Sequence, residues 1–240
     1  MKYLDLTFPT PAENLACDEA LLDWCENGHC ADEILHVWEP VHYFVVAGYA
    51  NKAATEVNLP ACESRQVPVL RRCSGGGTVL QGPGCLNYTL ILEIAGADPL
   101  RSIATTNRFV MNRNREALGT LLNRPVNVQG HTDLAIDGLK CSGNSQRRRR
   151  RFLLFHGTFL LNFDLRLVKE LLPLPSQQPG YRQNRAHTDF LTNLNLPAEE
   201  LKAALRETWS ANSPLETPPL RAMAALARGK YTTQEWNSKF

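Results

Sequence analysis

The sequence predicts an α+β domain with mixed, mainly antiparallel sheets flanked by helices. Two observations lead to this prediction. Short runs rich in β-branched and aromatic residues occur in blocks, and the helical segments lie between these blocks without alternating strictly with the strands. The 240 residues contain no internal repeat and no low-complexity linker, so we expect a single domain over 1–240.

Helical spacing and capping residues place three helices. The first is expected to start at Thr10, because threonine can cap the free amides, Pro11 suits the first turn, and Glu13 can complete a capping box. Its apolar positions are Cys17, Ala20, Leu21 and Trp24, which share one face. Asn27-Gly28 would end it. Two further helices are expected at about 107–122 and 198–209.

The β-rich runs predict the strands. Four runs lie between the first and second helices, at 34–38, 43–47, 67–71 and 86–94. Strands are expected again within 126–164, before the last of the three helices. This order of elements is typical of an α+β domain.

Composition excludes several classes of protein. Hydrophobic residues make up 43% of the chain and charged residues 21%, but no apolar run approaches the ~20 residues that a membrane helix needs. The seven cysteines lack C-x-x-C spacing, so neither a disulfide framework nor a zinc site is indicated. The start of the sequence lacks the features of a signal peptide. We therefore expect a cytoplasmic protein without membrane contact.

The basic charge is concentrated in one place. Arg147 to Arg151 are five consecutive arginines, and without them the 26 basic residues fall to 21 against 24 acidic residues. A surface-wide basic field of the kind that binds nucleic acid is therefore not expected. A solvated loop and a contact with an anion or an acidic partner both remain open for this run.

The first chemical motif follows the predicted strand that ends at Arg71. Gly75, Gly76 and Gly77 let the backbone approach a ligand closely, and their amides can form an anion-binding nest beside Arg71 and Arg72. The motif matches neither the P-loop nor the dinucleotide-binding fingerprint. A flexible turn without a ligand is the alternative.

The second motif is a hairpin centred on Asp137-Gly138, which favours a type I′ turn. The register predicted from this turn pairs Ala135 with Lys140 and Leu134 with Cys141. Lys140 would then share a face with Ala135 and, diagonally, with Asp133, while Cys141 packs in the core. A surface lysine paired with a carboxylate is the alternative to a functional site.

Together these motifs resemble the lipoate–protein ligase A family, within the superfamily of biotin and lipoate ligases and octanoyltransferases. The resemblance is carried, in family order from about residue 3 to the C-terminus, by residues 14–22, 38–40, 71–77, 86–88, 133–140, 142–147 and 156–161. It implies a biotin/lipoate ligase-like catalytic domain without the small C-terminal accessory domain of the longer ligases. A separate polypeptide could supply that domain.

The resemblance implies that lipoate and Mg²⁺·ATP form lipoyl-adenylate, which a lysine of a carrier protein then attacks. Lys140 matches the family lysine and would stabilise developing charge. Arg72 would neutralise phosphate, and Asp133 would hold Mg²⁺ or orient Lys140. The remaining contacts to substrate or adenylate are assigned to Ser74, Gly75, Gly76, Gly77, Thr78, Ser142, Gly143, His156 and Gly157.

One departure points toward the octanoyltransferases. Where many lipoate ligases have a His-Asp pair, residues 81–85 resemble the His-Gly-Pro-Gly pattern of transferases that form a cysteine thioester. The nucleophile positions of the two transferase types correspond here to Leu153 and to 126–132, and neither contains cysteine. Cys73, Cys85 and Cys141 lie near the motifs, and Cys85 is the remaining candidate. A non-catalytic lipoyl-binding scaffold is a further alternative, whereas the biotin ligase signatures are absent.

The expected partner is a lipoyl carrier: an H protein-like carrier, the lipoyl domain of an acyltransferase, or a lipoate-binding protein of similar shape. Arg149 and Arg150 are expected at the mouth of the site, where they would attract an acidic carrier. Arg147 is the member of the run expected to reach the adenylate phosphate. The protein is expected to act as a monomer.

Overall fold

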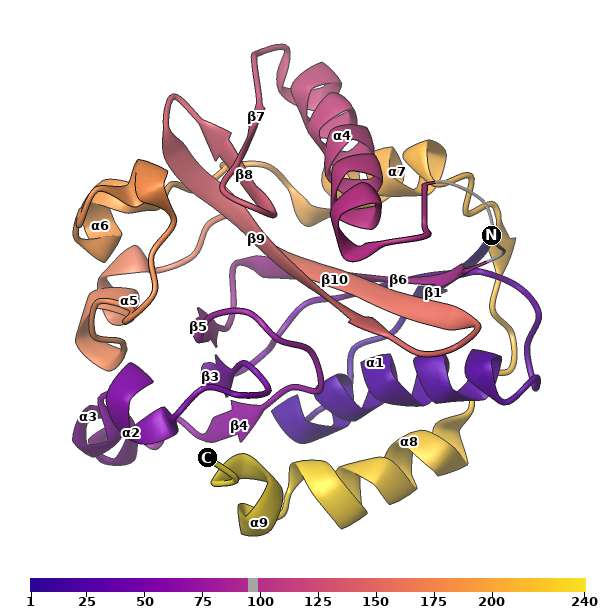
Figure 1. Ribbon diagram of the computed structural model, residues 1–240, viewed down its shortest axis with the longest axis horizontal. Coiled ribbons are helices and arrows are strands. Elements are labelled where there is room, and N and C mark those ends of the chain that lie inside the picture. Colours follow the sequence, from indigo (N-terminus) through magenta and orange to yellow (C-terminus); the bar gives the residue numbers. More distant parts are fainter. Residues whose placement is uncertain (95–98) are drawn as a thin grey trace.

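The computed structural model describes residues 1–94 and 99–240, and its main feature is an eight-stranded mixed sheet (Figure 1). The strands lie in the order β11-β1-β2-β6-β10-β9-β8-β7. Their bounds are β1 (Lys2–Asp5), β2 (Ile34–Trp38), β6 (Cys85–Glu93), β7 (Asn127–Gln129), β8 (Asp133–Ile136), β9 (Leu139–Arg148), β10 (Phe152–Leu160) and β11 (Ser213–Pro214). β1 pairs in parallel with β2 and β11, and the other pairs are antiparallel.

A second sheet of three strands lies beside the large one. β3 (Phe44–Ala47) is its centre, parallel to β4 (Val69–Arg71) and antiparallel to β5 (Val79–Gln81). The short helices α2 (Ala53–Glu56), α3 (Leu59–Ser64), α5 (Leu165–Leu171) and α6 (His187–Phe190) lie at this end of the molecule (Figure 1).

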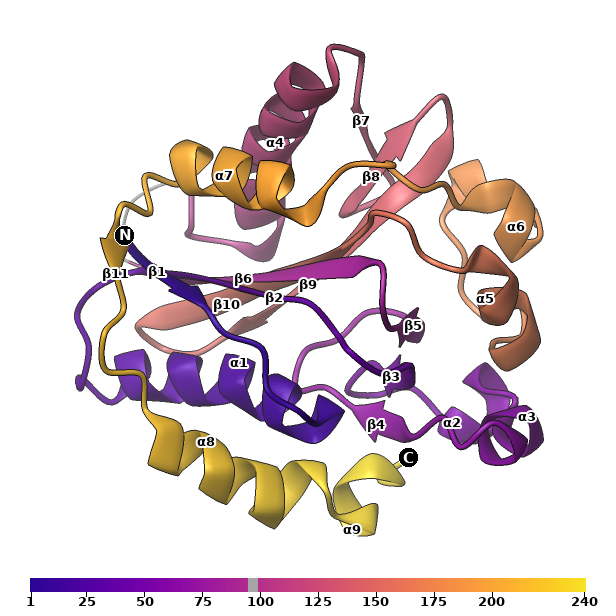
Figure 2. The same ribbon diagram turned by 180° about the vertical axis from the view of Figure 1, so that it is seen from behind.

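Longer helices cover both faces of the large sheet (Figure 2). α4 (Ile103–Leu122) and α7 (Ala198–Thr208) cover one face, where they enclose alternate residues of β6 and β10 such as Leu90 and Phe155. α1 (Pro11–Glu26) and α8 (Leu220–Leu226) cover the other, above Ile91 and Leu154. Since side chains alternate along a strand, the two faces bury different residues. None of the helices within 1–94 and 99–240 is long and apolar enough to cross a membrane.

The α+β architecture and most predicted elements are confirmed. The capping box of α1 forms, because Thr10 Oγ1 accepts from the amide of Glu13 and the Glu13 carboxylate accepts from the amide of Thr10. α4 begins four residues earlier than the expected position 107, since Ser102 and Thr105 make a second capping box. The predicted strand at 34–38 has the observed bounds, and the observed bounds of the other three differ by one or two residues.

The register of the Asp137-Gly138 hairpin was predicted only in part. Both turn residues have positive φ, +51° and +77°, as a type I′ turn requires, and Ala135 pairs with Lys140 as predicted. Beyond that pair the prediction is wrong, because an irregularity between Leu134 and Ala135 makes Leu134 face Ser142. Cys141 is the extra residue. It is buried, as expected, and its Sγ donates to the carbonyl oxygen of Leu134 at 3.3 Å.

The C-terminal segment, for which the sequence predicted no elements, packs against α1 and the small sheet. α8 continues through a π-helical turn (Ala227–Tyr231) to α9 (Gln234–Asn237). Lys230 Nζ pairs with the buried Glu19 at 2.6 Å, and the Tyr231 hydroxyl donates to the same carboxylate at 2.8 Å. These contacts join the segment to the middle of α1.

Arg71 joins the C-terminal segment to the small sheet. Its side chain is fully buried and donates to the carbonyl oxygens of Gly48, Tyr49 and Asn51 on one side, at 2.8–3.0 Å. On the other side it donates to the carbonyl oxygens of Trp236 and Asn237, at 3.2 and 3.1 Å. One guanidinium group thus fixes the loop after β3 and the end of the chain.

Arg71→Met is expected to destabilise the fold by about 3 kcal/mol or more, because it leaves several buried carbonyl oxygens without a donor. Urea unfolding followed by circular dichroism measures the change. Arg221→Met, at an exposed position, is the matched control and should change stability by less than about 0.5 kcal/mol. Equal midpoints for the two variants would contradict this role of Arg71.

Candidate active site

The three glycines form a turn between β4 and β5, residues 74–78, which we call the glycine turn. Gly76 has a φ of +86°, a left-handed conformation that glycine adopts without strain. Gly48, at the end of β3, passes so close that a Cβ atom on it would lie 2.0 Å from the carbonyl oxygen of Gly76. The shape of the turn therefore depends on glycine at both positions.

Arg72 holds the glycine turn from the inside. Its guanidinium group donates to the carbonyl oxygens of Gly75 and Gly77 at 2.6 and 2.8 Å, and its Nε donates to Ser74 Oγ at 3.1 Å. Burial lowers the pKa of Arg72 to about 10, so the group remains charged at neutral pH. The sequence led us to expect that Arg72 neutralises phosphate, and in the structure these three donors are bonded to protein oxygens.

The glycine turn presents its amides outward. The backbone N–H groups of Gly75, Gly76 and Gly77 have no acceptor within the described parts of the chain, and all three residues are exposed. Thr78, next in the turn, is hydrogen-bonded through Oγ1 to the Asn51 side chain at 3.1 Å. Consecutive free amides at a turn form a concavity that binds an anion or a developing oxyanion.

One row of paired residues crosses the large sheet beneath this turn. His36, Thr89, His156 and Ser145 are neighbours on β2, β6, β10 and β9. Asp18 of α1 meets the first three. Its Oδ1 accepts from Thr89 Oγ1 at 2.7 Å and lies 3.3 Å from His36 Nδ1, while its Oδ2 lies 2.9 Å from His156 Nδ1. The sequence had singled out only His156 of this row.

This row is bonded directly to the glycine turn. His156 Nε2 lies 2.6 Å from Ser74 Oγ, and Ser145 Oγ donates to the carbonyl oxygen of Gly75 at 2.9 Å. Burial alone would raise the pKa of Asp18, but hydrogen bonds from His156 and His36 outweigh burial and lower the pKa to about 2. A fixed negative charge therefore orients His156, which in turn positions Ser74.

Lys140 and Asp133 form an ion pair on the hairpin, as predicted. Lys140 Nζ lies 2.8 Å from Asp133 Oδ1, and the lysine side chain is 24% exposed, so it is open to a ligand. The ammonium group occupies the space above Gly143, where a Cβ atom would lie 2.8 Å from Nζ. Gly143 thus contributes room for Lys140. The other oxygen of Asp133, Oδ2, accepts from the Tyr181 hydroxyl at 2.8 Å, a residue that no sequence pattern had indicated.

The ion pair and the glycine turn face the same space. Gly143 and Ser145 are two residues apart on β9, so they lie on one face of the sheet, about 7 Å apart along the strand. Lys140 stands over the first, and the second touches Gly75. An activated carboxylate that is a few ångströms long could thus contact both the Lys140 ammonium group and the free amides of the glycine turn.

Two predicted site residues lie on the opposite face of the sheet, and their assignment is corrected. Ser142 is buried, and its Oγ accepts from the Asn144 amide at 3.2 Å. A Cβ atom on Gly157 would lie 1.7 Å from Asn144 Oδ1, so this glycine makes room for Asn144. Asn144 itself accepts from the Tyr88 hydroxyl at 2.6 Å, within the core under α4. Strand alternation separates these residues from the site.

The arginine run lies at the other end of β9 from Lys140, because this strand, which Figure 1 shows as a long ribbon, spans Leu139–Arg148. Arg149 is nine residues from Lys140, about 30 Å along a strand, and it pairs with Asp23 of α1 at 2.8 Å. Arg150 is exposed near the tip of the hairpin, where its amide bonds Glu26. The expected position of these two arginines at the mouth of the Lys140 site is therefore wrong. Arg147 is nearer the site, because its Nη1 donates to the carbonyl oxygen of Cys73 at 2.8 Å.

The donors around Asp133 do not form a resident metal site. No group of three or more His, Cys, Asp or Glu side chains suited to a metal ion occurs within residues 1–94 and 99–240. Asp133 already pairs with Lys140 and Tyr181. Mg²⁺ in nucleotide sites often takes one protein carboxylate together with phosphate oxygens, and a single carboxylate such as that of Asp133 would fit this kind of site.

The cysteines near the motifs are sealed in the core. Cys73, Cys85 and Cys141 are each at most 2% exposed, and burial raises the pKa of all three thiols to about 12. Of the seven cysteines, Cys30 alone is partly exposed. It precedes β2 at the end of the sheet that holds the arginine run, away from Lys140.

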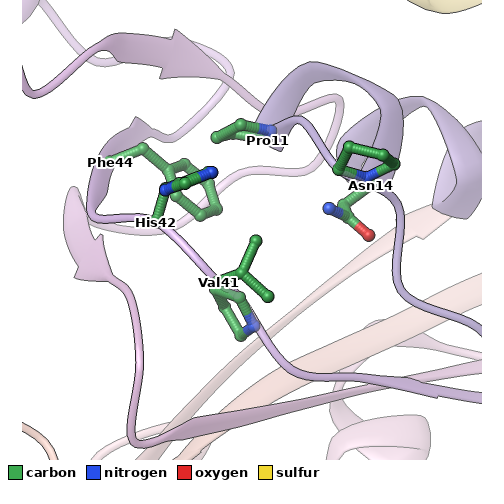
Figure 3. A pocket seen from close by; sticks show the side chains of 7 residues that line it. Pro11, Asn14, Val41, His42 and Phe44 are labelled. Carbon is green, nitrogen blue, oxygen red and sulfur yellow. The ribbon is translucent and has the colours of Figure 1, made fainter.

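A shallow hollow elsewhere on the surface contains none of the residues assigned to the site, although Asn14 and Pro40, which line it, belong to segments that carry the family resemblance (Figure 3). Pro11 and Asn14 of α1 face Val41, His42 and Phe44 across it. Its lining is mostly apolar, and His42 is its one titratable side chain. The glycine turn and Lys140 lie outside this hollow.

Residues 10–209 match the model of the lipoyl protein ligase A/B catalytic domain. The chain therefore belongs to this family, whose members are lipoate–protein ligases and octanoyltransferases. Octanoyltransferase LipM of Halalkalibacterium halodurans is 25% identical over an alignment of 272 residues, gaps included. The alignment covers 98% of this chain and 98% of that relative.

Two solved structures have the same fold. A bi-partite lipoate protein ligase from Thermoplasma acidophilum, described with its E2 lipoyl domain, has a TM-score of 0.81 and 23% identity, covering 99% of this chain and 95% of that one. A lipoate-protein ligase A bound with ATP has a TM-score of 0.80 and 24% identity, covering 99% and 98%. The predicted biotin/lipoate ligase-like fold is confirmed.

Gly143→Ala is expected to lower the kcat of acyl transfer to a lipoyl carrier about 10- to 100-fold, because the added methyl group displaces the Lys140 ammonium by about 1 Å. Stability should change little, since the group that moves is the end of a flexible side chain. Gly229→Ala, where a Cβ atom meets nothing within 4 Å, is the matched control. A Gly143→Ala protein with the kcat of the control would show that the position of Lys140 is not constrained by this glycine.

Proposed function

We propose that the chain is an ATP-dependent lipoate–protein ligase, a single catalytic domain over 1–240 that activates lipoate and transfers it to a lysine of a lipoyl carrier in the cytoplasm. This proposal rests on one combination of features. Free turn amides and the lysine of an ion pair face the same space, and the thiols of Cys73, Cys85 and Cys141 near them are buried. Such a site stabilises negative charge on an acyl phosphate and offers no thiolate to form a covalent intermediate.

The chemistry would proceed in two steps. A carboxylate oxygen of lipoate attacks the α-phosphorus of ATP, which forms lipoyl-adenylate and releases pyrophosphate. The amine of the carrier lysine then attacks the lipoyl carbonyl, which forms the amide and releases AMP and a proton. Charge develops on the phosphate in the first step and on the carbonyl oxygen in the second. Lys140 and the amides of Gly75, Gly76 and Gly77 would stabilise both.

Asp133 would serve this site in two ways. Its carboxylate keeps Lys140 in place at 2.8 Å, and it fits the single protein ligand that a nucleotide-bound Mg²⁺ often has. Similarity in fold to a ligase bound with ATP supports nucleotide binding at this site. Similarity to the T. acidophilum ligase described with its E2 lipoyl domain supports a lipoyl domain as the carrier. H protein-like carriers and lipoate-binding proteins of similar shape are the other candidate substrates.

Octanoyl transfer from an acyl-carrier protein is the second candidate, favoured by the similarity to LipM over nearly the whole chain. That reaction through a cysteine would need a thiolate that can reach both the donor and the carrier lysine. Cys85, the remaining candidate from the sequence, is 1% exposed, and burial raises its thiol pKa to about 12. Its position therefore favours the ligase over the thioester mechanism.

Mass spectrometry of a lipoyl domain tests the proposal directly. The purified protein is incubated with the domain and either lipoate plus Mg²⁺·ATP or an octanoyl-carrier protein without ATP. The proposal predicts a lipoyl mass increase on one lysine in the first mixture and none in the second. Modification only in the second mixture would replace the ligase with the transferase.

Lys140→Ala is expected to lower the rate of lipoyl transfer about 10²- to 10³-fold, which is typical of losing one preorganised charge in such a site. The variant should fold normally, since the side chain is partly exposed. Lys169→Ala, at an exposed position outside the site, is the matched control. Near-normal turnover by folded Lys140→Ala would remove this residue from the mechanism.

Cys73→Ser, Cys85→Ser and Cys141→Ser are each expected to keep ATP-dependent lipoyl transfer within about tenfold of the wild type, because an adenylate mechanism has no thioester intermediate. The rates are compared for variants of equal thermal stability. Complete loss of activity in Cys85→Ser alone, with octanoyl transfer by the wild type in the absence of ATP, would support the transferase.

A further inference from the structure

The two oxygens of Asp133 have different partners. Oδ1 pairs with Lys140 Nζ, and Oδ2 accepts from the Tyr181 hydroxyl, both at 2.8 Å. The carboxylate is a planar group on a short side chain, so fixing one oxygen fixes the direction of the other. The orientation of the Lys140 ammonium therefore depends on a residue 41 positions further along the chain.

Tyr181 is itself held on several sides. Its ring lies 5.1 Å from the ring of Phe190. On the hairpin side its Cε1 would be 3.7 Å from a Cβ atom placed on Gly130, in the turn before β8. Its carbonyl oxygen accepts from Arg185 Nη2 at 2.8 Å. The hydroxyl is thus presented to Asp133 by packing from elements on both sides.

The segment that carries Tyr181 is bonded along the lysine hairpin. Arg185 Nη2 also donates to the carbonyl oxygen of Gly138 at the hairpin tip, at 3.1 Å. Further along, the amide of Thr192 donates to the carbonyl oxygen of Lys140 itself, at 2.9 Å. Together with the hydroxyl of Tyr181 on Asp133, these contacts join residues 181–192 to the hairpin at three separate points.

Tyr181 is suited to act as a neutral donor. A phenol carries its proton at neutral pH, and the Tyr181 hydroxyl donates that proton to Asp133 Oδ2 at 2.8 Å. A hydrogen bond to a charged acceptor is stronger than one between neutral groups, so it can select one orientation of the carboxylate.

We propose that Tyr181 is a positioning residue for the acyl-activation step, acting on Lys140 through Asp133. The inference rests on the proposed function, in which Lys140 stabilises charge on the reacting phosphate and carbonyl. It adds that the position of the Lys140 ammonium group is set by the hydroxyl of Tyr181, which lies on a segment outside the hairpin. A purely structural tyrosine would contribute its ring alone, and its hydroxyl would be dispensable.

Tyr181→Phe removes the hydroxyl and keeps the ring, so it separates these two roles. The expected result is a kcat about tenfold lower, since the lost hydrogen bond is worth roughly one power of ten, with the KM values for lipoate and ATP changed less than about twofold. Tyr43→Phe is the matched control, because the Tyr43 hydroxyl has no partner within the described residues. Equal kcat values for Tyr181→Phe and the control would overturn the proposal.

A double-mutant cycle shows whether Tyr181 acts through Asp133. In an Asp133→Asn protein, Tyr181→Phe should lower the single-turnover rate by less than about twofold, because the pair that it orients is already broken. Equal effects of Tyr181→Phe in both backgrounds would show that its hydroxyl acts elsewhere.

A second readout does not depend on turnover. Acetylation of Lys140 by acetic anhydride, followed by peptide mass spectrometry, should be about threefold faster in Tyr181→Phe and in Asp133→Asn, without a further increase in the double variant. Unchanged labelling in Tyr181→Phe would overturn the positioning role. This measurement needs neither ATP nor a carrier. If the wild type proves to use an acyl thioester, the ligase proposal is rejected, but the labelling rates still show whether Tyr181 positions Lys140.

Discussion

Two adjacent buried guanidinium groups, those of Arg71 and Arg72, constrain the site more than any other interaction. A buried charge is costly unless hydrogen bonds replace its water, and here backbone carbonyl oxygens supply them. Arg71 collects carbonyls from the loop after β3 and from the C-terminal segment. Arg72 collects those of Gly75 and Gly77. The small sheet, the glycine turn and the C-terminal segment are thus joined at two neighbouring residues, the last residue of β4 and the residue that follows it.

The outward-facing amides follow from this constraint. Arg72 donates to the carbonyl oxygen of Gly75 and so orients the peptide group that carries the Gly76 amide. The amide of Tyr49 donates to the carbonyl oxygen of Ser74 at 2.8 Å and so orients the peptide group that carries the Gly75 amide. Gly48 lets β3 pass beneath the turn, and Ser145 and His156 hold it from the large sheet. The free amides of the glycine turn are therefore held in place by hydrogen bonds from buried side chains and from the large sheet. Lys140 of β9 places a positive charge in the same space.

Strand alternation divides β9 between two tasks. Gly143, Ser145 and Arg147 face the glycine turn and Lys140, where they give room, a hydrogen bond and a nearby charge. Asn144 and Gln146 point to the other face, where they bond Tyr88 and Asn107 beneath α4. Alternate residues of this continuous motif therefore belong to the site and to the core.

Local patterns predicted much of this arrangement. The capping box of α1 and the two-residue hairpin turn are encoded by residues within four positions of each other, and the Lys140–Asp133 pair follows from that turn. The bulge at Leu134 was missed because it depends on how β8 packs against its neighbours. Asp18 and Tyr181 reach the site only through tertiary folding, the first from α1 and the second from a short 3₁₀ helix, Gly180–Arg182, and their roles were not predicted. Arg149 was misplaced because the length of β9, and hence the distance to Lys140, was not predicted.

If this site activates a carboxylate with ATP, as we propose, lipoate-dependent exchange of labelled pyrophosphate into ATP measures that step without any carrier. We expect exchange that requires lipoate and Mg²⁺ and that falls at least about 100-fold in Lys140→Ala, since the lysine would stabilise the charge that develops on phosphate. No exchange by a folded wild-type protein that nevertheless transfers octanoyl groups from a carrier thioester would contradict the proposal.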